Sequence, residues 1–227
     1  MSRTKAWLSW STGKDSAWAL HELRARGEIE VVRLLTTVNS ANRRVAMHAV
    51  RESLLDAQAG ALGLPLLKVP IPPHCANAVY EQAMAAAIEQ AKAEGVLHMV
   101  FGDLFLADVR AYREERLAAC GVTGVFPLWG RDTAALAREM VAAGVRAVLT
   151  CVDPKQLSPS FAGRTFDPAL LAELPSGVDP CGERGEFHTC AFAGPMFRGP
   201  IAVKTGEIVE RDGFVFADVL PQEQELR

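Results

Sequence analysis

Apolar positions in the first two-thirds of the chain follow two patterns that alternate. Short apolar runs predict strands at residues 6–10, 31–38, 65–69, 96–101 and 146–152. Apolar residues at helical spacing between these runs predict helices at residues 14–26, 50–61, 79–86, 108–119 and 131–143. Strands that alternate with helices in this way are typical of α/β proteins, in which helices cover both faces of a parallel sheet.

The pattern changes in the last third of the chain, which is richer in proline and glycine. Three short apolar runs there predict strands at 201–204, 207–210 and 214–218. The pair Asp212-Gly213 predicts a hairpin turn between the last two, because glycine tolerates the positive φ that such a turn requires. We therefore expect an N-terminal domain at 1–152 and a smaller, β-containing C-terminal part at 153–227 that binds the substrate.

Composition narrows the class of protein. Of the 227 residues, 49% are hydrophobic and 22% charged, which is ordinary for a globular chain with a sizeable core. The net charge of −3 argues against broad binding to nucleic acids or anionic membranes. No apolar run approaches the length of about 18 residues that predicts a membrane span, and the N-terminus lacks a signal-peptide pattern. Five cysteines without a C-x-x-C pair indicate reduced thiols and a cytoplasmic protein, with homo-oligomerisation left open.

The strand at 6–10 runs directly into a polar turn and then into a helix. The turn reads Ser11-Thr12-Gly13-Lys14-Asp15-Ser16. A turn at a helix N-terminus presents free backbone N–H groups and the positive end of the helix dipole, which favour an anion such as phosphate. The alternative is a capped helix without a ligand, because serine and threonine are common capping residues.

The side chains of this turn suit the phosphates of ATP. Gly13 lets the backbone approach an anion, Lys14 supplies a full charge, and the hydroxyls of Ser11 and Ser16 can donate hydrogen bonds. Asp15 has the charge to bind Mg²⁺, directly or through water; the alternative is that it braces the loop. The turn is not the P-loop of kinases and GTPases, because that motif needs an upstream glycine and a serine or threonine after the lysine.

The turn resembles the Ser-Gly-Gly-Lys-Asp-Ser loop of the PP-loop ATP pyrophosphatases. The resemblance implies a Rossmann-like, adenine nucleotide alpha hydrolase-like fold and cleavage of ATP to AMP and pyrophosphate. It also implies that residues 11–16 bind the nucleotide and that Lys14 and Asp15 serve catalysis. Thr12 stands where the family has a glycine, and a threonine fits there if its φ is negative.

Three further stretches resemble the diphthine–ammonia ligase family, a branch of the PP-loop enzymes. They are residues 101–110, 126–130 and 179–189, the last containing Gly-Glu-Arg-Gly-Glu-Phe-His-Thr. The resemblance covers nearly the whole chain and is greatest to short prokaryotic members. It implies a ligase that adenylates a carboxylate, releases pyrophosphate and lets ammonia displace AMP.

The acceptor in eukaryotic and archaeal members is diphthine, a quaternary ammonium compound carried on translation elongation factor two. A bacterial member would need a different carboxylate, protein-borne or free. Because the sequence contains no glutaminase segment, we expect ammonia to be free or delivered by a partner.

Glu183 and Glu186 lie three residues apart in a glycine-rich segment beside His188. Two carboxylates on a turn can bind Mg²⁺, a cationic substrate group or ammonium. His188 can act as the base that deprotonates ammonium, because its charge changes near neutral pH. The alternative is a solvated turn without a chemical role. On the family pattern we expect these three side chains to be catalytic and residues 182–189 to form the acceptor pocket.

Gly102 and Asp103 follow the strand at 96–101, at the end where ligands of open parallel sheets bind. We expect both to contact the nucleotide, while Asp103 as a helix cap is the alternative. For His48, a contact with ATP and a position on the surface are both open alternatives. Cys181 is expected to serve packing.

Two other functions compete with the ligase. A PP-loop enzyme that modifies RNA would need a basic docking surface, which the net charge does not favour. A non-catalytic ATP-binding module would not need the carboxylates at positions 15, 183 and 186.

Overall fold

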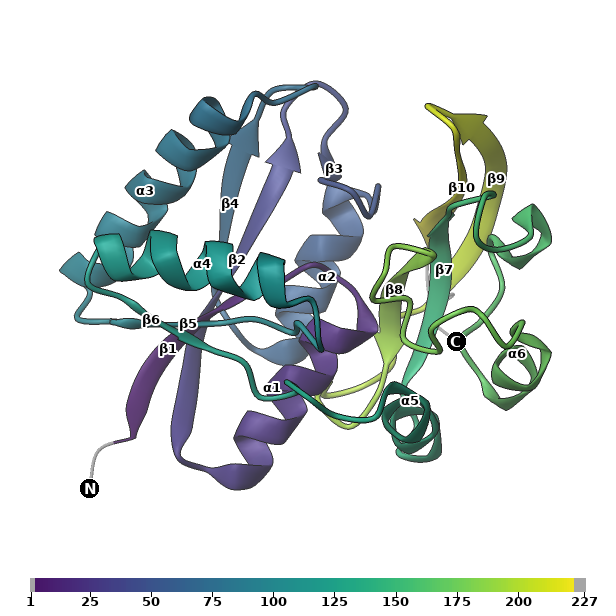
Figure 1. The fold of residues 1–227 in the computed structure, drawn as a ribbon, viewed down its shortest axis with the longest axis horizontal. Coiled ribbons are helices and arrows are strands. Elements are labelled where there is room, and N and C mark those ends of the chain that lie inside the picture. Colours follow the sequence, from purple (N-terminus) through teal and green to yellow (C-terminus); the bar gives the residue numbers. More distant parts are fainter. Residues whose placement is uncertain (1–2, 223–227) are drawn as a thin grey trace.

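Two β-sheets lie next to each other in the computed structural model, which describes residues 3–222 (Figure 1). Residues 223–227 of the predicted C-terminal part therefore lie outside the described residues. The first sheet contains β1 (Thr4–Ser9), β2 (Ile29–Asn39), β3 (Arg44–Val45), β4 (Leu66–Ile71), β5 (His98–Val100) and β6 (Thr123–Val125). Its strands pair in parallel, except that β3 pairs with the end of β2 in the antiparallel direction.

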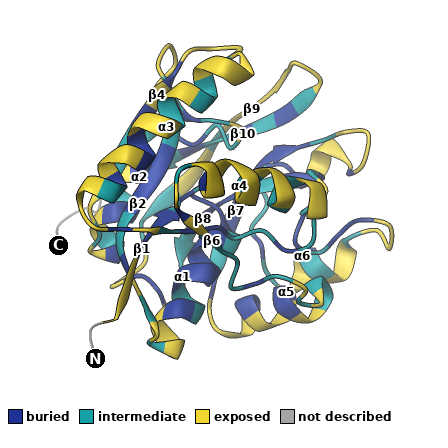
Figure 2. Cartoon of the chain, turned by 60° about the vertical axis from the view of Figure 1, so that its left-hand side comes forward, coloured by how far each residue is buried: buried dark blue, intermediate teal, exposed yellow. Residues whose placement is uncertain are grey.

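Helices cover both faces of the first sheet, as the alternating pattern predicts. They are α1 (Lys14–Arg26), α2 (Glu52–Leu62), α3 (Asn77–Ala93) and α4 (Ala107–Ala119). Successive side chains of a strand point to opposite faces. In β1, Ala6 and Leu8 accordingly pack with α1 and α2, whereas Trp7 packs with α3 and α4. The outer faces of α3 and α4 are exposed (Figure 2).

The second sheet is antiparallel, with its strands in the order β8-β7-β10-β9. Its strands are β7 (Arg146–Val152), β8 (Phe187–Ala193), β9 (Val203–Arg211) and β10 (Phe214–Pro221). Helix α5 (Thr133–Ala142), the 3₁₀ helix η1 (Pro159–Phe161) and α6 (Pro168–Glu173) accompany it. Residues of α1, β7 and β8 belong to the same hydrophobic cluster, so the core is continuous from one sheet to the other.

The placement of residues 146–152 in the parallel sheet is wrong, because this strand is β7 and pairs antiparallel with β8 and β10. Six of its seven residues are buried. A continuous apolar run of this kind has the same pattern in a parallel sheet and in the middle of an antiparallel one. The division of the chain into domains stays a prediction, and the sheet to which β7 belongs favours a boundary before residue 146.

The predicted hairpin turn at Asp212-Gly213 is confirmed, with φ values of 54° and 79°. The predicted break between 201–204 and 207–210 is wrong, because β9 continues through it. Within residues 3–222, no helix has the length and apolar character that a membrane crossing requires.

Candidate active site

Residues 11–16, called here the phosphate loop after the role predicted for them, run from the end of β1 into the first turn of α1 and lie across β8. The Thr12 carbonyl accepts a hydrogen bond from the Ala191 amide at 2.9 Å. The Lys14 amide donates to the Thr189 hydroxyl at 3.1 Å, so this N–H is not free, contrary to the expectation for the turn. A Cβ added to Gly13 would lie 3.3 Å from Thr189, and glycine allows this close approach. The fold thus brings two motifs together that are far apart in sequence.

Thr12 adopts a φ of 72°, so the condition of a negative φ is not met. The Ala191 amide and the Gln58 side chain both donate to its carbonyl and hold the peptide in this orientation. The left-handed conformation costs a non-glycine residue about 1–2 kcal/mol. The Thr12 hydroxyl is also buried without a hydrogen-bond partner among the described residues. The loop is therefore strained where the family has a glycine.

Gln58 is a buried polar residue of α2 that sequence reasoning missed. Its Nε2 donates to the carbonyls of Thr12, at 3.0 Å, and Ala191, at 2.7 Å. Its Oε1 accepts from Trp10 Nε1 at 2.8 Å. The available signal was a polar residue within the otherwise apolar stripe of a predicted helix.

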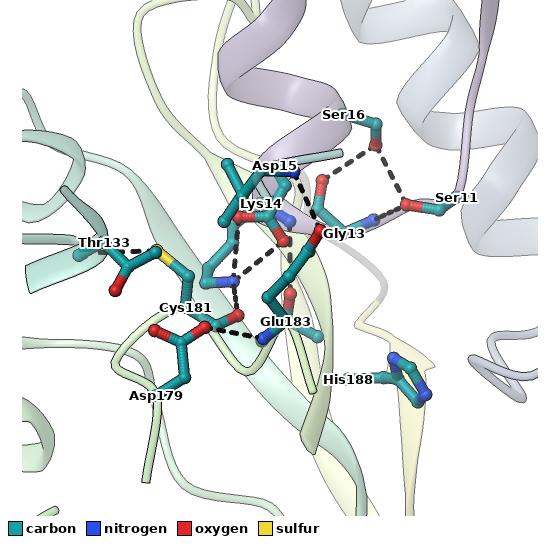
Figure 3. A network of polar contacts seen from close by, with 12 residues as sticks. Ser11, Gly13, Lys14, Asp15, Ser16, Thr133, Asp179, Cys181, Glu183 and His188 are labelled. Carbon is teal, nitrogen blue, oxygen red and sulfur yellow. Dashed lines mark hydrogen bonds and ion pairs between the residues drawn. The ribbon is translucent and has the colours of Figure 1, made fainter. Parts of the chain in front are cut away.

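The ammonium group of Lys14 ties the phosphate loop to the turn that contains Cys181 (Figure 3). It lies 2.9 Å from Asp15 Oδ2 and donates to the Cys181 carbonyl. The rings of Phe166 and Phe187 are each 5.4 Å away. Burial lowers the pKa of Lys14, but the charge of Asp15 and neighbouring groups outweigh it and raise the pKa above its ordinary value. Lys14 is therefore a buried, charged tether.

Glu186 is folded back into its own turn. One carboxylate oxygen accepts the Asp179 amide at 2.8 Å, and the other accepts the Arg184 amide at 3.0 Å. Glu186 is 1% exposed and does not line the cavity that the other predicted side chains share. The carboxylate holds the turn closed. Gly182, with a φ of 71°, completes it, because a Cβ there would lie 2.7 Å from the Phe187 carbonyl.

Glu183, in contrast, points into that cavity. Its Oε1 accepts the Leu104 amide at 2.8 Å, and its own amide donates to Asp179 at 2.8 Å. Burial and the nearby charges of Asp15 and Asp103 raise the pKa of Glu183 to about 7, although the Leu104 hydrogen bond opposes this shift. The carboxyl group can therefore exchange a proton near neutral pH.

His188 lies on β8, so the predicted acceptor segment is a turn followed by a strand. Its ring packs on that of His48, with the ring centroids 4.7 Å apart. The Nδ1 atom of His48 is 3.2 Å from the Thr189 carbonyl. Burial lowers the pKa of His48 to about 3 and that of His188 to about 4. Both rings are thus neutral at pH 7, and His48 faces the site instead of lying on the surface.

Gly102 lies against the start of α1, and Gly102 and Asp103 both line the cavity. A Cβ on Gly102 would lie 2.8 Å from the Ser16 amide nitrogen, so glycine allows the end of β5 to approach the helix. Asp103 pairs with Arg113, at 2.7 Å between Oδ2 and Nε. Burial raises the pKa of Asp103, and Arg113 opposes this shift. Asp103 does not cap α4, because the residue at the cap is Leu106.

The loop of residues 11–16 and the segment 181–189 line a cavity of about 250 Å³, called here the reaction cavity after the role proposed for it below. Its polar lining residues include Ser11, Lys14, Asp15, Ser16, Asp103, Glu183, His188 and Thr189. A larger cavity of about 670 Å³ lies at the ends of β1, β2 and β4 and is called here the nucleotide cavity, after the role proposed for it below. The two cavities share the lining residues Ser9, Ser11, His48, Arg113 and His188, so they adjoin. Within residues 3–222, no three His, Cys, Asp or Glu side chains form a cluster suited to a metal ion.

Comparisons with known proteins match both halves of the chain. The sequence model of the diphthamide synthase N-terminal domain matches residues 4–124, and that of the C-terminal domain matches residues 132–219. The chain is 28% identical to a diphthine–ammonia ligase of Danio rerio over 237 residues, which cover 92% of this chain and 90% of the relative. A diphthine–ammonia ligase of Mus musculus is 28% identical over 234 residues, or 92% of this chain and 86% of the relative.

The relative in Schizosaccharomyces pombe is 30% identical over 94 residues, which are 40% of this chain and 16% of that protein. The alignments cover 90% and 86% of the two vertebrate relatives, so length does not separate this chain from them. The resemblance noted in the sequence is confirmed over the two domains. The chain belongs to the diphthamide synthase family and contains both of its domains.

Proposed function

We propose that this protein is an ATP-dependent ligase that adenylates a substrate carboxylate, releases pyrophosphate and forms an amide with ammonia. The observation that carries the proposal is the reaction cavity, where the phosphate loop and Glu183 face the same space. Relatives named diphthine–ammonia ligase, aligned over 92% of the chain, support this type of reaction.

The nucleotide cavity is the proposed site for the adenosine part of ATP. It lies at the carboxyl ends of parallel strands, where ligands of open α/β sheets bind. Its volume of about 670 Å³ is in the range of small-molecule sites. Ser11 lines both cavities, so the phosphates are proposed to run along residues 11–16 toward Lys14. This order places the α-phosphorus at the junction, within reach of a carboxylate in the reaction cavity.

Asp15 is the proposed protein ligand for the Mg²⁺ that accompanies ATP. Magnesium in such sites takes most of its ligands from phosphates and water and one or two from carboxylates. Asp15 fits, because its side chain is 25% exposed and lines the reaction cavity. When bound, the ion would neutralise charge on the phosphates and on the departing pyrophosphate.

Glu183 is the proposed base for amide formation. Ammonium must lose a proton before its nitrogen attacks the acyl carbon, and AMP then leaves with the electrons of the C–O bond. A carboxyl group with a pKa of about 7 is present in both forms at neutral pH and can accept that proton. His188, predicted for this step from the sequence, has a pKa of about 4 and is the weaker base.

Product analysis tests the proposal. ATP labelled at the α-phosphorus should give AMP and pyrophosphate when Mg²⁺, ammonium and a panel of carboxylic acids are supplied. Lys14→Met and Glu183→Gln should lower this turnover, while Arg138→Ala, on the exposed side of α5, should not. Formation of ADP and orthophosphate would contradict the ligase, and ATP that binds but stays intact with every acceptor would favour a non-catalytic module.

A further inference from the structure

A third cavity, of about 220 Å³, lies between the C-terminal hairpin and the strap, defined as residues 40–51 between β2 and α2. Residues of both elements line it, among them Asn42 and Arg44 of the strap and Arg211, Phe214 and Phe216 of the hairpin. His188 lines this cavity, the reaction cavity and the nucleotide cavity. The third cavity therefore adjoins the site at His188.

The strap is fastened to the second sheet by Asp218 of β10. This carboxylate accepts from Arg44 Nη1 at 2.9 Å and from Arg51 Nε at 3.0 Å. Two guanidinium groups thus share one carboxylate, which leaves an excess of one positive charge beside the cavity. The wall formed by the strap is fixed in place by these bonds.

The lining of the third cavity is electropositive. Its lining residues include Arg44, Arg211, Asn39 and Asn42, and no aspartate or glutamate is among those described. Asp212 lies 3.7 Å from Arg211, but both side chains are more than half exposed, and such pairs contribute little. A ligand group with negative charge matches this lining.

Among the described residues, no carboxylate lines the third cavity, so it offers no site for a cationic acceptor group. Both Glu186 oxygens are occupied by backbone amides of the turn. Asp15, Asp103 and Glu183 line the reaction cavity and not the third cavity. In the third cavity, Arg211 already lies over the ring of Phe216, 4.9 Å from its centroid, where a quaternary ammonium would otherwise bind.

We propose that the third cavity admits the acceptor and binds a second anionic group of it, while the reacting carboxylate extends past His188 into the reaction cavity. The substrate class is a dicarboxylic acid, in contrast to a carboxylic acid that bears a quaternary ammonium. The role of the second group as part of an acceptor rests on the proposed ligase function. The anion site itself can be tested without turnover.

Nuclear magnetic resonance of histidine side chains provides the test. The chain has five histidines, and comparison with His188→Gln assigns the His188 imidazole signals. Glutarate and trimethylglycine are titrated at constant pH into folded, histidine-labelled protein with a non-hydrolysable ATP analogue. Arg211→Glu is the test variant, and Arg138→Glu, the same charge change on the exposed side of α5, is the matched control. Thermal melting verifies that both variants are folded.

Glutarate should shift the His188 signals to saturation, and Arg211→Glu should weaken this binding at least tenfold, while Arg138→Glu leaves it unchanged. Trimethylglycine should cause no saturable shift. The proposal is overturned if trimethylglycine binds as tightly as glutarate, if glutarate does not saturate, or if Arg211→Glu has no effect. If glutarate binds but ATP is converted to ADP, the ligase proposal is contradicted and the anion site stands. If AMP forms but glutarate does not bind, the anion site is contradicted and the ligase proposal stands.

Discussion

The amide of Lys14 donates a hydrogen bond to the Thr189 hydroxyl at 3.1 Å, across 175 residues of sequence. The bond joins the first turn of α1 to β8. The ammonium group of the same lysine bonds the Cys181 carbonyl, so one residue holds the phosphate loop both to β8 and to the turn that precedes it. A change on β8 should therefore be detectable at the phosphate loop.

Thr189→Val should show this coupling. Valine keeps the volume of the side chain but leaves the buried Lys14 amide without an acceptor, which costs about 1–3 kcal/mol of unfolding free energy. Urea denaturation measures this loss, and calorimetry should show weaker ATP binding. Thr189→Ser retains the hydroxyl and should stay closer to the wild type. Equal stability of the valine and serine variants would show that the bond contributes nothing.

Thr12 allows a test of backbone strain. Alanine is ordinarily more stabilising than glycine, but at a φ of 72° the order should reverse. We expect Thr12→Gly to exceed Thr12→Ala in unfolding free energy by about 1 kcal/mol, because glycine alone adopts this conformation without a steric cost. Chemical denaturation of both variants decides the point. A more stable alanine variant would mean that the loop relaxes to a negative φ.

Glu183 should make stability fall as pH rises. Its pKa is about 7 in the folded protein and about 4.5 ordinarily, so the folded state binds its proton more tightly. The resulting stabilisation is complete below pH 4.5 and is lost as pH rises through 7. Relative to the wild type, Glu183→Gln should become progressively more stable over this window and level off above it. Unfolding experiments at several pH values measure the difference, and a difference independent of pH would contradict the assigned pKa.

His48 and His188 should have the opposite effect and make stability fall as pH falls. Their pKa values of about 3 and 4 lie below the ordinary 6.5, so the unfolded state binds protons first as pH falls. Stability contributed by the neutral rings is complete above pH 6.5 and is lost as pH falls toward 3–4. Each ring contributes up to about 1.4 kcal/mol per pH unit.

His188→Gln should therefore flatten the acid side of the stability curve. His74→Gln, at an exposed position, is the matched control and should leave the slope as it is. If the two variants lose stability in parallel with the wild type between pH 6.5 and 4, the burial of His188 does not govern its titration.

Local patterns in the sequence predicted the helices better than the arrangement of the strands. Helix α1 has the predicted bounds, because polar residues start it at the phosphate loop and Gly27, with a φ of 71°, ends it. The bounds of β7 were also predicted, but its sheet was not. Burial on both faces determines the apolar pattern of a strand, whereas its direction depends on partners that a single segment does not contain.

The same distinction holds for the candidate site. The residue types of the phosphate loop and of the segment 182–189 indicated that both belong to a site. The sequence could not show which of Glu183 and Glu186 faces the cavity, since the two carboxylates are alike until the turn folds. Glu186 accepts amides of its own turn, and this use depends on backbone geometry. His48 and Arg113 reach the cavity through tertiary packing alone.

Gln58 has a consequence for which substitutions the chain tolerates. Its amide gives two protons to carbonyl oxygens and accepts one from an indole, so each face of the group has a fixed polarity. Glutamate would set an oxygen against the carbonyls of Thr12 and Ala191. Leucine or methionine would fill the space but would leave the Trp10 indole without its acceptor and remove one donor from each of the Thr12 and Ala191 carbonyls. Asparagine is shorter by one methylene group than the span between these partners. Position 58 thus admits one residue type for reasons that lie outside its own helix.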